Sequence, residues 1–217
     1  MAALELYTYF RSSAAYRVRI ALNLKNIPYE MRFVNLLNGS QRLPEYRKLN
    51  PQGLVPALIE DGLLFVQSLA IIEYLEEIHP QPPLLPRDLR ERAFVRALAN
   101  IVACDIHPLN NLRVLTYLKD TLHQDQVACS AWIRHWIEEG LNAFEQHLVA
   151  QGKTGRFCLG DLPTIADICL VPQIFNARRF GCDLTALSRI EAIDANCLAL
   201  AAFREAAPDR QPDALKT

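Results

Sequence analysis

The chain of 217 residues contains no run of about 18 apolar residues, and no basic stretch followed by an apolar one opens it. Neither a membrane-spanning helix nor an export signal is indicated, so a cytoplasmic protein is expected. Net charge is also small, because 23 Lys and Arg stand against 24 Asp and Glu. A protein that coats nucleic acid needs a strong positive excess, so neither nucleic acid nor a membrane is expected as a partner.

Closely spaced cysteines are absent as well. The six cysteines are scattered singly, with no Cys-x-x-Cys pair and no histidine at ligand spacing. A structural zinc site is therefore not expected, and no metal is predicted. In a reducing compartment these cysteines are expected to serve as small apolar side chains.

The type of secondary structure signal changes at a proline-rich stretch, residues 80–86, which is typical of an extended linker. Strand and helix signals alternate before it, whereas nearly everything after it follows helical spacing. We therefore expect a first domain over residues 1–83 and a second, all-helical domain over residues 84–217.

The first domain is expected to follow the order βαβ-α-ββ-α. The expected elements are strand 4–9, helix 14–25, strand 30–35, a short helix at 44–48, strands 55–60 and 63–66, and helix 69–78. Asp61-Gly62 between two apolar runs indicates a hairpin, and Ser68 is expected to cap the last helix. This order predicts the α+β thioredoxin-like arrangement, in which helices cover a four-stranded sheet.

Four helices are expected in the second domain, near residues 89–119, 125–148, 164–178 and 188–204. The first two are long enough to form an antiparallel pair. Thr164 with Asp167, and Ser188 with Glu191, fit the capping-box pattern of a helix start. The tail from Pro208 onward is expected to be loosely ordered.

The first helix is preceded by features of an anion site. Ser12 and Ser13 stand where a strand ends and a helix begins, and no acid occurs between Leu6 and Tyr29. Three arginines surround the two serines: Arg11, Arg17 and Arg19. Unpaired N–H groups and the helix dipole stabilise a negative group there, and a hydroxyl can donate a further bond. The alternative is that a serine simply caps the helix.

Two later segments add to this site. Gln67 and Ser68 present a carboxamide and a hydroxyl at the start of another helix, which suits a carboxylate. Pro56 opens an apolar strand, and a cis bond after Val55 would turn the backbone outward to pair with a peptide-like ligand. Each feature alone has a structural alternative, a turn or an ordinary cap. Together they describe glutathione, with its sulfur near Ser12.

Three runs of residues carry a resemblance to a known family. They are Tyr-Phe-Arg-Ser-Ser-x-x-x-Arg-Val-Arg-Ile-Ala-Leu, Leu-Asn-Pro-Gln-x-x-Val-Pro-x-Leu and Gln-Ser-x-Ala-Ile-Ile-Glu-Tyr-Leu-Glu-Glu. Further matches in the C-terminal half include the closing Arg-Gln-Pro-Asp at 210–213. The sequence resembles the zeta class of glutathione transferases, which includes maleylacetoacetate isomerases and bacterial maleylpyruvate isomerases. The resemblance covers nearly the whole chain.

The resemblance implies glutathione transferase architecture and a set of site residues. Ser12, with Ser13 beside it, would be catalytic, and the cofactor glutathione would be held by Gln52, Val55, Gln67, Ser68, His107 and Asn111. Arg11, Arg113 and Arg179 would bind the carboxylates of the substrate. His107 could instead be an interfacial histidine, and Arg113 a solvated or dimer-facing charge. Pro108 is expected to kink the helix around them.

One departure from the family concerns the residues after the two serines. The family commonly shows Ser-Ser-Cys-Ser, whereas this chain has Ala14 and Ala15 at the third and fourth positions. Cysteine-dependent disulfide exchange is therefore not expected. Isomerisation is expected to survive, because the nucleophile belongs to glutathione.

The implied activity is glutathione-dependent cis–trans isomerisation of a maleyl keto acid, either maleylacetoacetate or maleylpyruvate, by a homodimer. Glutathione is regenerated, so it acts as a cofactor. One alternative is a transferase that conjugates glutathione to small electrophiles such as α-haloacids. Another is a non-catalytic thioredoxin-like module.

Overall fold

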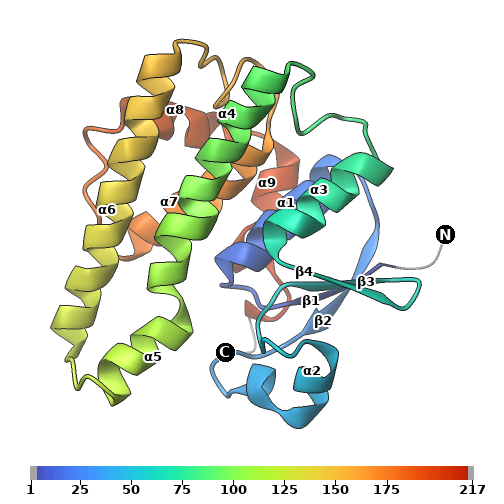
Figure 1. Ribbon diagram of the computed structural model, residues 1–217, viewed down its shortest axis with the longest axis vertical. Coiled ribbons are helices and arrows are strands. Elements are labelled where there is room, and N and C mark those ends of the chain that lie inside the picture. The colour runs from blue at the N-terminus through green and yellow to red at the C-terminus, as the bar shows by residue number, and fades with distance from the viewer. Residues whose placement is uncertain (1–3, 215–217) are drawn as a thin grey trace. The chain divides into compact units, whose positions relative to one another are not determined.

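The computed structural model describes residues 4–214, which separate into two compact units (Figure 1). The first unit comprises the chain up to Pro83 and the segment from Ala199 onward, and the second comprises Leu84–Leu198. The contacts therefore group the end of the chain with its beginning. Among the described residues, no helix is both long and apolar enough to cross a membrane.

The first unit is built on a four-stranded mixed sheet. Its strands are β1 (Leu4–Thr8), β2 (Tyr29–Phe33), β3 (Ala57–Glu60) and β4 (Leu63–Val66), in the order β2-β1-β3-β4. Strand β1 runs parallel to β2 and antiparallel to β3, and the β3–β4 hairpin turns at Asp61 and Gly62, both with positive φ. The expected thioredoxin-like arrangement is confirmed.

Helices α1 (Ser13–Leu24), α2 (Pro44–Leu49) and α3 (Ser68–Ile78) complete the expected order of this unit. A further helix, α9 (Ala201–Ala206), packs on α1, where the Tyr16 hydroxyl donates to the carbonyl of Phe203 at 3.2 Å. Helix α1 is consequently buried on most of its surface, including the side chains of Arg17 and Arg19.

The expectation of a loosely ordered tail is wrong for residues 208–214. Pro208–Arg210 forms a short 3₁₀ helix, η4, and the Gln211 amide donates to the carbonyls of Glu205 and Ala207 at 2.8 and 2.9 Å. Buried Asp213 accepts a hydrogen bond from the Phe10 N–H at 2.9 Å. These bonds compensate for the two prolines and the mixed charge that suggested disorder. The division into domains 1–83 and 84–217 stays a prediction.

The second unit is helical. Its helices are α4 (Leu89–Asn100), α5 (Leu112–Asp120), α6 (Gln126–Gln151), α7 (Ile165–Arg179) and α8 (Ser188–Leu198). The single helix expected over residues 89–119 is interrupted by a π-helical turn, η2 (Ile101–Ile106), and a 3₁₀ turn, η3 (His107–Asn110). Pro108 accounts for the break, because proline cannot continue an α-helical hydrogen-bond ladder. The helix expected over 188–204 is also divided, since α9 turns to pack on α1.

The helix starts in this unit show one expected cap and one unexpected cap. Buried Asp167 accepts hydrogen bonds from the N–H and hydroxyl of Thr164, both at 2.7 Å, as the capping-box pattern predicts. At the start of α8, by contrast, the first-turn N–H groups of Arg189 and Ile190 donate to Glu145 of α6, each at 3.0 Å. A carboxylate from another helix thus accepts the N–H groups of the first turn of α8.

A buried ion pair joins the end of α1 to the end of α3. Lys25 Nζ lies 2.7 Å from Glu76 and donates to the carbonyls of His79 and Pro82 at 2.6 and 3.1 Å. Its side chain is fully buried. All three ammonium protons therefore have acceptors, which is the condition under which a buried charge is tolerated.

We expect Lys25→Met to lower the free energy of unfolding by about 3 kcal/mol, because Glu76 would be left buried without its counter-charge. Urea denaturation followed by circular dichroism measures the loss. Arg32→Met is the matched control, because the Arg32–Glu5 pair has a similar length, 2.8 Å, and lies at the surface. That variant should unfold at nearly the same urea concentration as the unaltered protein, because solvent screens a surface ion pair. Equal losses in the two variants would contradict the assignment.

Candidate functional site

Ser12 both caps α1 and keeps a proton to donate. Its Oγ accepts a hydrogen bond from the Ala15 N–H at 3.2 Å, and its own N–H donates to the carbonyl of Tyr9 at 3.0 Å. The Ala14 N–H, in the first turn, has no acceptor among residues 4–214. A hydroxyl that accepts one bond can still donate another, so capping and anion binding are compatible here. Ser13, the first residue of the helix, is buried.

The three arginines near Ser12 have different surroundings. Arg11 is partly exposed, and its guanidinium lies over the Phe10 ring at 5.0 Å and donates to the Tyr9 hydroxyl at 3.2 Å. Arg19 is fully buried. Burial lowers the pKa of Arg19 to about 10, an effect that Tyr29 and Asp213 partly oppose, so the side chain stays cationic at neutral pH.

Arg17, one of the three arginines expected around the anion site, reaches a predicted residue of the second helix start. It is buried, and its Nη1 donates to Ser68 Oγ at 3.2 Å. The Ser68 hydroxyl accepts this bond and can donate its own proton to a carboxylate. Arg17 follows Ser12 by five residues. That spacing alone does not show that the side chain of Arg17 points from α1 toward α3.

Gln67 and Ser68 begin α3 in a way that differs from our expectation. The helix starts at Ser68 itself, and Gln67 occupies the cap position without a side-chain cap. Gln67 has a φ of 70°, an uncommon left-handed conformation for a residue other than glycine. Its side-chain amide donates to Gln52 Oε1 at 3.0 Å. The structure thus brings together two residues that lie far apart in the sequence.

The segment before β3 presents an open peptide edge. The Val55–Pro56 bond is cis, and neither the N–H nor the carbonyl of Val55 has a hydrogen-bond partner within residues 4–214. The preceding Leu54 carbonyl accepts from the Tyr46 hydroxyl at 2.7 Å and from Asn50 at 2.8 Å. Burial raises the pKa of Tyr46 to about 12, which keeps this hydroxyl protonated. The segment is therefore held in place while the N–H and the carbonyl of Val55 stay unpaired within residues 4–214.

The features of the first unit fit glutathione. An unpaired backbone N–H and carbonyl at Val55 suit the peptide group of a cysteinyl residue. The start of α3, with Ser68, suits a carboxylate. The start of α1, with the Ser12 hydroxyl, suits a sulfur anion. All of these groups belong to the first unit.

The remaining predicted residues belong to the second unit. His107 begins the 3₁₀ turn η3, and Asn111 caps α5 by accepting a hydrogen bond from the Arg113 N–H at 3.1 Å. Arg113 is exposed in the first turn of α5. Arg179 ends α7 at the surface, with its guanidinium 5.0 Å from the Phe180 ring, whereas neighbouring Arg178 pairs with Asp194 at 2.5 Å.

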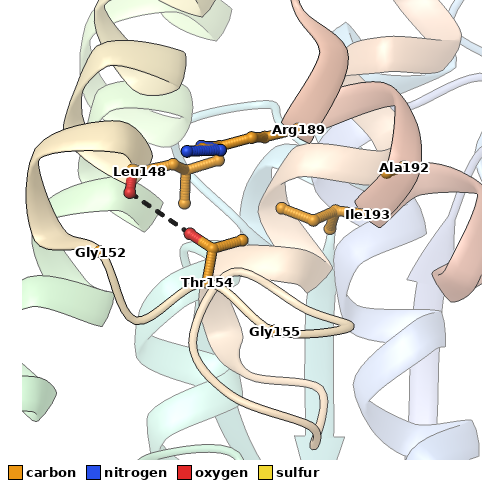
Figure 2. A pocket seen from close by; sticks show the side chains of 7 residues that line it. All are labelled: Leu148, Gly152, Thr154, Gly155, Arg189, Ala192 and Ile193. Carbon is orange, nitrogen blue, oxygen red and sulfur yellow. Dashed lines mark hydrogen bonds between the residues drawn. The ribbon is translucent and has the colours of Figure 1, made fainter.

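A small pocket of the second unit is lined by none of the predicted site residues (Figure 2). It has a volume of about 220 Å³ and lies between the end of α6, the following loop and α8. Its lining residues are Leu148, Gly152, Thr154, Gly155, Arg189, Ala192 and Ile193. Within residues 4–214, no group of three or more His, Cys, Asp or Glu side chains is arranged to hold a metal ion.

Comparison with known proteins assigns the family. The model of the glutathione S-transferase N-terminal domain matches residues 6–83, and that of the C-terminal domain matches residues 130–194. The chain is 50% identical to a maleylpyruvate isomerase from a Ralstonia species, over 97% of this chain and 99% of that protein.

Two solved structures are similar along nearly their whole length. One is a bacterial maleylpyruvate isomerase, a zeta-class glutathione S-transferase in its holo form, with a TM-score of 0.95, 51% identity, and coverage of 96% of this chain and 99% of that one. The chain belongs to the zeta class of glutathione transferases. The other structure is a maleylacetoacetate isomerase of Methylobacterium extorquens AM1 with bound malonate and glutathione, with a TM-score of 0.93, 44% identity, and coverage of 96% and 98%.

The family assignment covers all three loops of the first unit that carry predicted site residues. The matched N-terminal domain contains every predicted residue of the first unit, from Arg11 to Ser68. This zeta-class transferase carries Ala14 and Ala15 directly after its two serines, and Ala15 supplies the N–H that Ser12 accepts. The Ser12 cap therefore forms without the cysteine common in the class.

Proposed function

We propose that this zeta-class transferase is a glutathione-dependent cis–trans isomerase of a maleyl keto acid, either maleylacetoacetate or maleylpyruvate. The observation that carries the proposal is the start of α1, where Ser12 keeps a hydroxyl proton to donate beside the unpaired Ala14 N–H. The names of its relatives, which are isomerases of these two substrates, support the same activity.

The residues of the first unit hold glutathione and keep its sulfur ionised. When bound, glutathione supplies a thiolate that adds to the conjugated cis double bond, permits rotation, and leaves again with the trans isomer formed. A free thiol has a pKa of about 8.5, and a hydrogen bond to a charged acceptor contributes about 1.5 to 3 kcal/mol. The Ser12 hydroxyl and the α1 dipole therefore make the thiolate the main form near neutral pH.

The substrate is held through its carboxylates. Arg11, Arg113 and Arg179 are proposed as the cations that bind them, because a guanidinium grips a carboxylate with two parallel hydrogen bonds. The malonate bound in the M. extorquens isomerase supports a dicarboxylate site in this class. His107 and Asn111 are proposed to contact glutathione.

The proposed assembly is a cytoplasmic homodimer. The first helix of the second unit, α4, would contribute to the shared surface, and its first residue, Leu89, leaves 80% of its surface exposed. Sedimentation equilibrium of the purified protein measures the number of subunits.

The deciding experiment is an assay of both substrates with and without glutathione. We expect glutathione-dependent formation of fumarylacetoacetate or fumarylpyruvate, and the preferred substrate is the one with the larger kcat/KM. Accumulation of a stable thioether with α-haloacids, and no isomerisation of either keto acid, would instead identify a conjugating transferase. A protein that shows no glutathione binding by calorimetry would be a non-catalytic module.

A further inference from the structure

The loop that precedes Ser12 is held by residues from both ends of the chain. Asp213 accepts a hydrogen bond from the Phe10 N–H at 2.9 Å, across 203 positions of sequence. The buried Arg19 guanidinium donates to the Phe10 carbonyl at 3.0 Å and to the Tyr9 carbonyl at 3.4 Å. The N–H and the carbonyl of Phe10 are therefore both fixed by buried, charged side chains.

These hydrogen bonds position two site residues, Ser12 and Arg11, although neither residue takes part in them. The Tyr9 carbonyl also accepts a hydrogen bond from the Ser12 N–H at 3.0 Å. Arg19 and Ser12 therefore share one acceptor, the Tyr9 carbonyl. Arg11 lies over the Phe10 ring, 5.0 Å from its centre. A shift of the Phe10 peptide would move both the hydroxyl that faces the thiolate and a cation proposed to bind substrate.

The directions of the Tyr9 and Phe10 carbonyls also affect how well the start of α1 can hold a negative charge. Arg19 draws the oxygen atoms of the Tyr9 and Phe10 peptides toward the buried interior of the first unit. If the Phe10 peptide were released, a carbonyl oxygen could turn toward the start of α1. A partial negative charge there would oppose a sulfur anion.

The segment that carries Asp213 is itself anchored. Gln211 is buried, and its side-chain amide donates to the carbonyls of Glu205 and Ala207 at 2.8 and 2.9 Å. Arg19 Nε donates to the Ala206 carbonyl at 3.0 Å. Helix α9 and the turn after it therefore hold Asp213 against the loop as a rigid support.

We propose that Asp213 is a positioning residue for the reaction, which acts through the Phe10 peptide on Ser12 and Arg11. The inference rests on the proposed function, and it gives the closing Arg-Gln-Pro-Asp sequence a physical role. The side chain at position 213 must be long enough to place a hydrogen-bond acceptor at the Phe10 N–H, because that N–H has no other partner in the described chain.

The test compares Asp213→Ala with a conservative variant and a control. Asp213→Ala is expected to lower kcat/KM at least about tenfold at neutral pH, to raise the KM for the keto acid, and to move the pH–rate profile toward alkaline pH. Asp213→Asn keeps an oxygen that can accept the Phe10 N–H, so it should stay within about threefold of the unaltered protein. Asp209→Ala, at an exposed position of the same segment, should change neither quantity.

Two readouts are independent of turnover. Ultraviolet titration of bound glutathione should show its thiol pKa rising in Asp213→Ala and staying unchanged in Asp209→Ala. Hydrogen exchange at the Phe10 amide should be slow in the unaltered protein and at least about tenfold faster in Asp213→Ala. If the alanine variant does not fold, Asp213→Ser, whose hydroxyl ends short of the Phe10 N–H, is expected to show the same alkaline shift.

A folded Asp213→Ala or Asp213→Ser variant with unchanged thiol titration and pH profile would overturn the proposal. The exchange measurement separates this failure from a failure of the proposed function, because it needs no substrate and no glutathione. If the unaltered protein binds glutathione without isomerising either keto acid, the thiol titration still tests Asp213.

Discussion

Replacing Ser12 with alanine is expected to lower glutathione-dependent isomerisation at least about tenfold at neutral pH while the protein remains folded. The thiolate would lose a hydrogen bond worth about 1.5 to 3 kcal/mol, which corresponds to a rise of about one to two in its pKa. A thiol pKa lowered by Ser12 makes activity available at neutral pH, so the variant should recover activity as the pH is raised. Steady-state rates measured against pH provide the test.

The two roles of Ser12, capping and thiolate binding, can be separated by controls. Ser12→Gly also lacks the hydroxyl, but glycine at a cap position costs only a few tenths of a kcal/mol, so its activity should fall as in Ser12→Ala with little loss of stability. Asp125→Ala removes the cap of α6, where Asp125 accepts from the Ala128 N–H at 2.8 Å. It should lose about 1 kcal/mol of stability and no activity. Full activity in Ser12→Gly would remove Ser12 from the mechanism.

Asp167→Ala is expected to have the largest effect on stability, a loss of about 4 kcal/mol in the free energy of unfolding. The fully buried Asp167 carboxylate accepts hydrogen bonds from the N–H and hydroxyl of Thr164, both at 2.7 Å, and from the Cys158 N–H at 2.8 Å. Alanine would leave these donors buried without an acceptor at the start of α7, which is buried over most of its length.

The two tryptophans of the chain report on this change directly. Trp132 and Trp136 both lie in α6, so fluorescence during urea denaturation follows the second unit. Asp161→Ala is the matched control, because exposed Asp161 accepts a single hydrogen bond from within residues 4–214, from the Arg156 N–H at 3.2 Å. It should lose less than about 1 kcal/mol. The Asp167 assignment fails if the two variants unfold at the same urea concentration.

The local signals of the first unit were sufficient to predict its fold. Strand alternation, the Asp61-Gly62 turn and the proline after Val55 are short-range features, and each acts within a few residues. The same holds for the Thr164–Asp167 capping box. The positions of Ser12 and Gln67 at helix starts followed from the same kind of signal, which is why these parts of the candidate site were predictable.

The features that the sequence did not reveal depend on contacts between distant segments. Glu145 caps α8 from another helix, and Arg17 reaches Ser68 across two helices. The order of the tail depends on Asp213 meeting Phe10. The π-helical turn before His107 changes the ladder of hydrogen bonds without any glycine or proline inside it. No pattern of neighbouring residues encodes the contacts of Glu145, Arg17 and Asp213, because each of them forms only once the chain has folded back on itself.

The return of the chain end to its beginning has a consequence for biosynthesis. Translation proceeds from the N-terminus, and domains generally fold as they emerge from the ribosome. Here the strand-and-helix part is made first, yet Arg19 and Phe10 wait for Ala206 and Asp213, which are synthesised 187 and 203 residues later. That part can settle into its final form only after Asp213 has been synthesised, so a truncation before Ala206 would damage the part encoded first.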